Sequence, residues 1–206
     1  MASYDASSMD VTGTTLTKWR NKQGMLGSAA DLTPAKPQFP ITVSQGAAYF
    51  TGRDKETYLD TAAFASALSV DKATFIARIR FGGDSDQVAN TVFSSNNVNT
   101  FTFLRRNNGT RLMTGGSSPG PYLDSQIAPA NSEWVFLAMV LDKGIVRIYL
   151  NDSFEQGSTA AGGSLPSLRL GANNSGANRL VGDISHFRVY NRAIGADELK
   201  EIRASL

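Results

Sequence analysis

The stretch EWVFLAMVLDKGIVRIYLND, residues 133–152, decides the fold because it holds two strands and the tight turn that joins them. Residues 134–141 are apolar at every position, which is typical of a strand buried on both faces in the middle of a sandwich. After the turn at 142–144, residues 146–150 alternate apolar and polar side chains, as in a strand with one buried face. Asn151 and Asp152 end this strand and are interpreted as turn residues.

The same period of two recurs along most of the chain. Residues 73–81, ATFIARIRF, alternate with a single exception and predict another strand. Residues 100–106 and 110–116 flank Asn-Asn-Gly, which tolerates positive φ and therefore predicts a hairpin. Further strands are expected at 91–97, at 167–171 and within 180–194. Strands at this spacing, separated by Gly and Asn turns, indicate an all-β sandwich or barrel.

One segment has a helical start, spacing and length. It is GADELKEIRASL at 195–206, where Leu199 and Ile202 continue an apolar stripe from Ile194. The Pro-rich stretch 31–43 is interpreted as a loop that crosses the sandwich, because strand-like patterning resumes after it. With no internal repeat and no dividing linker, residues 1–206 are predicted to form a single domain.

Composition excludes several classes of protein. The 20 Lys and Arg and 18 Asp and Glu are scattered, without the basic stripe that nucleic acid requires. With no cysteine, thiol catalysis and disulfides are excluded. No apolar run reaches the roughly 20 residues of a membrane helix, so membrane insertion is not expected. The start MASYDASSMD lacks the regions of a secretory signal peptide. Two alternatives follow for the expected virion or extracellular location: the chain is a module of a secreted parent, or it leaves the cell by another route, such as assembly into a phage particle.

Four ordered segments resemble a known family. They are SYDASSMDVTGTTLTKWRNKQG (3–24), AAYFTGRDKETYLDT (47–61), the stretch 133–152 and LVGDISHFRVYNRAIGADELKEI (180–202). Together they resemble laminin G-like domains of the concanavalin A-like lectin and glucanase superfamily. The resemblance implies a jelly-roll β-sandwich of two antiparallel sheets with a short C-terminal helix. It leaves function open, because this fold carries lectins, adhesion domains, virion proteins, glucanases and lyases.

Catalytic patterns are weak. Glycoside hydrolysis needs two carboxylates facing one bond, but the acidic clusters at 52–56, 82–86 and 196–201 fall in turns or on the terminal helix. Lyase members use a His or Tyr base with a charge-neutralising Arg, and His186, Arg188 and Tyr190 share one strand face. The same segment is also the ordinary closing strand of the family. A non-enzymatic protein is therefore predicted, with polysaccharide lyase or glycoside hydrolase as the alternative.

Polar loops supply the candidate binding residues. Sugar sites combine aromatic faces with Asn, Asp and Arg side chains, and turns require several of the same residue types for backbone reasons. The predicted carbohydrate-binding residues are Asn96, Asn97, Arg105, Arg106, Asn108, Tyr122, Asn173, Asn174 and Arg179.

The family resemblance also implies one calcium ion at the rim of the sandwich, held by aspartate and backbone carbonyls. Asp84 and Asp86, which follow the strand ending at Phe81, are the candidate ligands. No other cofactor is indicated.

These observations favour a non-catalytic, lectin-like surface module. Because the opening segment resembles phage and bacterial surface proteins, we expect a virion protein, either a head decoration or a tail component, that binds glycans or the host surface. The alternative is a purely structural virion assembly protein without glycan binding. The expected partners are cell-surface polysaccharide and other virion proteins, and a homo-oligomer is left open.

Overall fold

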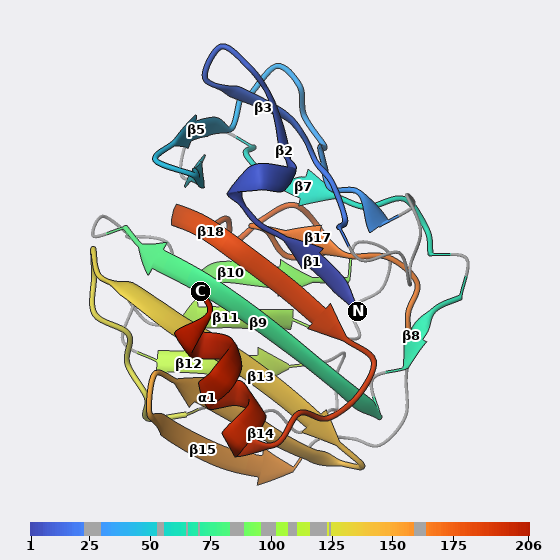
Figure 1. Cartoon of the computed structure of the whole chain (residues 1–206), viewed down its shortest axis with the longest axis vertical. Coiled ribbons are helices and arrows are strands. Elements are labelled where there is room, and N and C mark those ends of the chain that lie inside the picture. The colour runs from blue at the N-terminus through green and yellow to red at the C-terminus, as the bar shows by residue number, and fades with distance from the viewer. Residues whose placement is uncertain are drawn as a thin grey trace.

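The computed structural model of the chain is a two-layered β-sandwich with one helix near the C-terminus (Figure 1). It describes residues 1–22, 30–52, 56–64, 66–69, 71–82, 89–95, 102–106, 111–115, 123, 125–158 and 164–206. For residues 89, 102, 104, 106 and 111–115 it describes the backbone alone.

The larger sheet has ten strands within the described residues, all paired antiparallel. Their order is β15-β14-β13-β9-β18-β6-β5-β3-β2, with β1 paired to β18 beside this path. Their bounds are β1 Ala2–Tyr4, β2 Met9–Thr12, β3 Thr15–Trp19, β5 Thr42–Ser44, β6 Ala47–Thr51, β9 Lys72–Phe81, β13 Trp134–Asp142, β14 Ile145–Leu150, β15 Ser153–Ser158 and β18 Val181–Tyr190.

The smaller sheet has six described strands in the order β12-β11-β10-β17-β7-β4. Their bounds are β4 Thr33–Pro34, β7 Leu59–Asp60, β10 Ala89–Ser94, β11 Thr102–Arg106, β12 Arg111–Gly115 and β17 Arg169–Leu170. The remaining elements are the ribbon of β8 Leu68–Ser69 with β16 Ser164–Leu165, the 3-10 helix η1 Ala6–Ser8 and the helix α1 Ala196–Ala204. In the described ranges, neither helix is long and apolar enough to cross a membrane.

The main core lies between the two sheets. Phe75 of β9 stacks on Phe93 of β10 with ring centroids 4.4 Å apart, and Phe187 of β18 packs 5.9 Å from the same ring. Trp19 and Phe50 are fully buried in the same cluster. Aromatic and branched side chains from facing strands fill the space between the layers, which is the main source of stability in a chain without disulfides.

A second core lies on the outer face of the larger sheet, beneath α1 (Figure 1). Leu199 and Ile202 of the helix join Ile194 there and pack on side chains of β9, β13 and β18. The predicted apolar stripe of the helix is thus confirmed. The two cores also explain why residues 134–141 are apolar throughout: one face of β13 meets the sandwich interior and the other meets α1.

The strands predicted from alternation are confirmed. Residues 73–81 lie in β9, and β11 and β12 pair antiparallel in the register of a hairpin, although the residues of the turn between them lie outside the described part. The prediction for 31–43 was incomplete. This stretch contributes β4 to one sheet and β5 to the other, because Thr33 pairs with Asp60 and Thr42 with Tyr49.

Candidate functional site

The corner that follows β14 fastens two strands together. Asn151 has φ +52, a conformation that asparagine tolerates better than most residues. Its backbone N–H donates to the Phe136 carbonyl at 2.9 Å, and its side-chain Oδ1 accepts the Phe136 N–H at 3.0 Å. The turn interpretation is therefore confirmed, and the amide of Asn151 has a structural partner on β13.

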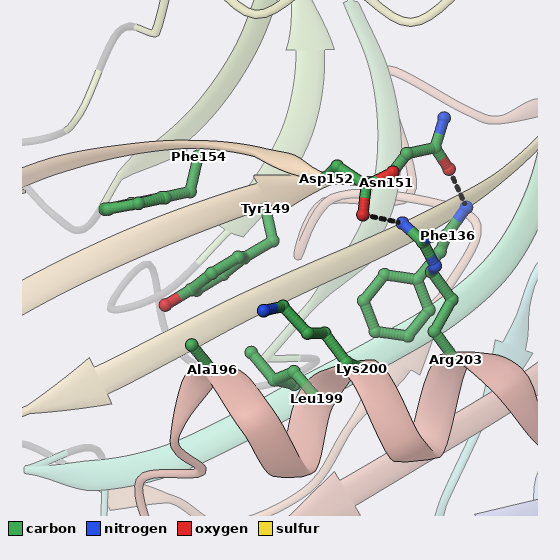
Figure 2. Close-up of a pocket in the computed structure, with 9 residues that line it drawn as sticks. All are labelled: Phe136, Tyr149, Asn151, Asp152, Phe154, Ala196, Leu199, Lys200 and Arg203. Carbon is green, nitrogen blue, oxygen red and sulfur yellow. Dashed lines mark hydrogen bonds and ion pairs between the residues drawn. The ribbon is translucent and has the colours of Figure 1, made fainter.

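The next residue ties the same corner to the helix. Asp152 Oδ1 lies 2.8 Å from Arg203 Nη1, so a charged pair bridges the end of β14 and the last turn of α1 (Figure 2). Both side chains reach solvent, and exposed pairs of this kind contribute at most about 1 kcal/mol to stability. The pair therefore matters more for the surface it forms than for the free energy of unfolding.

Between this corner and the helix lies a hollow of about 220 Å³. Figure 2 shows it bounded by side chains of β13, β14 and β15 on one side and by α1 on the other. Its lining residues are Phe136, Tyr149, Asn151, Asp152, Phe154, Ala196, Leu199, Lys200 and Arg203. Sites for drug-sized ligands span roughly 300–1,000 Å³, so this hollow suits a single ring.

Two aromatic rings form the outer wall of the hollow. Tyr149 and Phe154 pair across β14 and β15, and their rings stack with centroids 5.2 Å apart and planes 23° apart. Phe154 is 55% exposed, which is unusual for a phenylalanine on a strand. Lys200 extends from α1 over the hollow, and Asp152 with Arg203 closes one end (Figure 2). An apolar platform beside charged hydrogen-bonding groups is the combination that carbohydrate recognition uses.

Sequence reasoning missed this site. Phe154 stands alone among polar residues in the segment NDSFEQGS, so it carries no apolar pattern that would predict a buried strand. A bulky aromatic residue isolated on a polar edge strand was the available signal.

Three of the predicted binding residues lie together on the loop between β17 and β18. Asn173 Oδ1 accepts the backbone N–H groups of Ser175 at 3.1 Å and Ala177 at 2.8 Å. Arg179 Nε donates to the Gly176 carbonyl at 2.8 Å, and the Asn174 carbonyl accepts from Arg169. The side chains of Asn173 and Arg179 therefore organise the loop itself, as turn chemistry requires.

Arg169, which was not predicted, anchors that loop. Its guanidinium makes two 2.7 Å contacts with the carboxylate of Asp60 and donates to the carbonyls of Asn173 and Asn174. It also lies 4.4 Å from the ring centroid of Tyr58. Burial acts to lower the pKa of Arg169, but the hydrogen bonds and charge of Asp60 outweigh it, so the pKa is raised and the charge is kept.

Arg105 lies inside the sandwich. It is 2% exposed, its guanidinium stacks 4.9 Å from the Phe81 ring centroid, and it donates to Asn131 Oδ1. Burial lowers the pKa of Arg105. In this position the side chain of Arg105 is enclosed by its neighbours and takes part in the packing inside the sandwich.

The other predicted residues fall beyond what the structure describes. Of Arg106 the backbone alone is described, in β11, and Asn96, Asn97, Asn108 and Tyr122 lie outside the described residues. Asp84 and Asp86, the candidate calcium ligands, lie outside them as well. Across the described ranges, no group of three or more His, Cys, Asp or Glu side chains is placed to hold a metal ion.

The lyase alternative rests on three residues of β18, and the structure separates their environments. His186 and Arg188 are half-buried, whereas Tyr190 is 8% exposed and packs beneath α1. Burial, joined by the charges of Arg188, Arg78 and Lys22, lowers the pKa of His186 against the opposing effect of Asp5. Although the three share a strand face, the Tyr190 ring belongs to the second core.

The two packed sheets and the closing helix define a jelly-roll sandwich of the lectin-like class. A family profile described as the concanavalin A-like lectin/glucanases superfamily matches residues 51–200, and the chain belongs to this family. A comparison with the sequences of curated proteins finds no match.

Several solved structures share the fold. Domain 4 of AbnA, a GH43 extracellular arabinanase from Geobacillus stearothermophilus in complex with arabinotriose, has a TM-score of 0.62 at 18% identity, covering 98% of this chain and 96% of that one. The Ruminococcus gnavus IT-sialidase CBM40 bound to α2,3-sialyllactose has a TM-score of 0.53 at 15% identity, with coverages of 64% and 82%. Trypanosoma rangeli sialidase has a TM-score of 0.66 at 10% identity, with coverages of 97% and 31%. At these identities the likeness concerns the fold alone.

Proposed function

We propose that the chain is a non-catalytic glycan-binding module and that the hollow between β14, β15 and α1 is its binding site. The observation that carries the proposal is the position of Phe154, exposed to solvent and stacked on Tyr149 at the wall of a hollow with charged groups. The apolar face of a sugar ring covers such a platform, and its hydroxyls exchange hydrogen bonds with Asp152, Lys200 and Arg203. The lectin-like fold supports this assignment.

The composition of the hollow supports binding without catalysis. Glycoside hydrolysis uses two carboxylates roughly 5–9.5 Å apart, one on each side of the scissile bond. Among the described residues that line the hollow, Asp152 is the single carboxylate, and it is paired with Arg203. Within the described lining, a sugar held here therefore meets no second acid that would donate a proton to a leaving group.

A glycan array with matched variants tests the proposal. The wild type is expected to bind at least one class of glycan, and Phe154→Ala to lose most of that binding. Tyr49→Ala is the control, because Tyr49 is an exposed aromatic residue of the same sheet that does not line the hollow. Absence of binding by the folded wild type, or equal losses in both variants, would refute the assignment.

The virion role extends the proposal. The opening segment resembles phage and bacterial surface proteins, which supports a head decoration or tail component at a virion or extracellular location. The neighbouring reading frames are then expected to encode capsid, portal or tail proteins, and mass spectrometry of purified particles should detect the chain. A particle that contains the chain, with no glycan binding on the array, would favour the purely structural alternative.

The rim loops form a second proposed contact surface. Asn173, Asn174 and Arg179 lie on the loop between β17 and β18, and Asn174→Ala is the variant that leaves the loop-organising hydrogen bonds of Asn173 and Arg179 in place. Calcium at Asp84 and Asp86 is likewise proposed. A rise in melting temperature with added calcium, abolished in Asp84→Asn, would support it, whereas an unchanged melting temperature counts against it.

A further inference from the structure

A second hollow of about 230 Å³ adjoins the first on the outer face of the larger sheet. The two share Phe136, Asn151 and Arg203, so they meet at the Arg203 side chain. The second adds Arg78 from β9, Trp134 and Val135 from β13, and Leu206. The two hollows lie on either side of the Arg203 side chain, so an elongated ligand that crosses Arg203 would reach both the aromatic platform and Trp134.

Two arginines lie over the Trp134 ring. The guanidinium carbons of Arg78 and Arg80 are 4.9 and 5.2 Å from its centroid. Stacking on an indole face fixes the plane of a guanidinium and leaves its N–H edge available for hydrogen bonds. The Trp134 ring thus orients two arginine side chains, and these two differ in whether a carboxylate neutralises their charge.

Arg80 has a carboxylate partner, and Arg78 has none among the described residues. The Nε and Nη2 atoms of Arg80 each lie 3.0 Å from Asp183 Oδ2. Arg78 makes a long hydrogen bond of 3.4 Å to the hydroxyl of Ser185. Since Asp183 neutralises Arg80 and Asp152 neutralises Arg203, Arg78 is the cation of this hollow whose charge is left for a ligand.

We propose that Arg78 forms a carboxylate subsite and that the module binds acidic glycans, with one sugar ring on Phe154 and a uronate-type carboxylate at Arg78. This inference rests on the proposed glycan-binding function. A planar guanidinium held over the Trp134 ring matches a carboxylate through two parallel N–H···O contacts. Lys200 adds positive charge along the same path, so acidic chains are also attracted at a distance.

Tryptophan fluorescence provides a reporter inside the subsite. The chain has two tryptophans, of which Trp19 is fully buried in the main core and Trp134 is half-buried in the hollow. Titration with trigalacturonate is expected to change the emission of Trp134 and to give tighter binding than the matched neutral galactotriose. Trp134→Phe should remove the signal while calorimetry still detects the ligand.

Variants of Arg78 test whether this residue causes the preference for the acidic trisaccharide. Arg78→Gln is expected to bind trigalacturonate at least about tenfold more weakly, because the charge-assisted hydrogen bonds to the carboxylate are lost, and to bind galactotriose as the wild type does. Arg78→Lys keeps the charge without the planar fork and should fall between the two. Arg147→Gln is the matched control, because Arg147 is paired with Gln156 and lines neither hollow.

The outcomes separate the two levels of the proposal. Equal affinity of the wild type for the acidic and neutral trisaccharides, or equal losses in Arg78→Gln and Arg147→Gln, overturns the carboxylate subsite. Phe154-dependent binding of neutral glycans would then still uphold the glycan-binding function. Failure of every glycan, acidic and neutral, overturns both. Thermal melts of each variant confirm that a loss of binding is not a loss of folding.

Discussion

Replacing Arg169 by methionine tests whether one buried cation holds the loop between β17 and β18. The Arg169 side chain is 11% exposed and that of Asp60 is 22% exposed, so water screens their contact poorly. The substitution removes two 2.7 Å charge-assisted hydrogen bonds and leaves the Asp60 carboxylate without its partner. It also frees the carbonyls of Asn173 and Asn174.

The magnitude follows from that burial. Removing one partner of a fully buried ion pair costs about 3–5 kcal/mol, and the partial exposure of Asp60 reduces this to about 2–4 kcal/mol. For a domain of this size each kcal/mol corresponds to roughly 2–4 °C in Tm, so Arg169→Met is expected to melt about 5–15 °C lower. Urea unfolding followed by circular dichroism measures the same loss as a free energy.

Two further variants test whether Arg169 anchors the loop through its contact with Asp60. Arg179→Met on the same loop should cost less than about 1 kcal/mol, because Arg179 makes one hydrogen bond to the Gly176 carbonyl and a longer 3.4 Å contact with Glu56. Adding Asp60→Asn to Arg169→Met should recover part of the stability, since no unpaired charge then remains. The anchoring role is contradicted if the free energy of unfolding of Arg169→Met lies within about 1 kcal/mol of the wild-type value. It is also contradicted if Arg179→Met lowers that free energy as much as Arg169→Met does.

Three other perturbations follow from single sites. Gly182→Ala is expected to lower the free energy of unfolding by more than about 2 kcal/mol in urea titrations, because its Cβ would lie 2.2 Å from the Arg80 carbonyl oxygen; a neutral result would contradict the contact. Asn151→Gly should cost about 1 kcal/mol for the lost hydrogen bond to Phe136, and Asn151→Ala more, because alanine is also strained at φ +52. Burial, with nearby cations, lowers the pKa of His186, so the unfolded chain binds a proton more readily and stability falls as pH drops below about 6.5. Thermal melts of His186→Asn between pH 5 and 7 should show a flatter profile than the wild type.

The fold was predictable because strands and turns are local features. The period of two in 73–81 and in 146–150 identifies the buried face of each strand before any tertiary contact is known. The helical stripe of Leu199 and Ile202 is equally local. The exception is 31–43, where β4 and β5 form through pairing with distant strands, and where proline masks the β pattern.

The candidate site was not predictable in the same way. Alternation places Arg105 and Tyr190 on particular faces, but it does not tell whether a face meets solvent, the main core or α1. Arg105 lies inside on Phe81, and Tyr190 lies under the helix. Conversely, Phe154 is apolar by residue type yet exposed, because no element beyond β15 is paired to that edge of the larger sheet within the described residues. Which side chains are free for a ligand depends on how the layers are covered.

The length of α1 explains why hollows occur on this face. A helix of nine residues spans about 13.5 Å, whereas the ten residues of β9 span about 33 Å. The helix therefore covers less than half of the outer face along the strands, and the uncovered part needs side chains that tolerate water. Two stacked pairs of side chains, Arg78 with Trp134 and Phe154 with Tyr149, occupy this uncovered part. In each pair, part of one side chain stays in contact with water. Lengthening α1 by one apolar turn is accordingly expected to close the Trp134 hollow and abolish the preference for acidic glycans, while the stacked Tyr149 and Phe154 rings at its far end stay open.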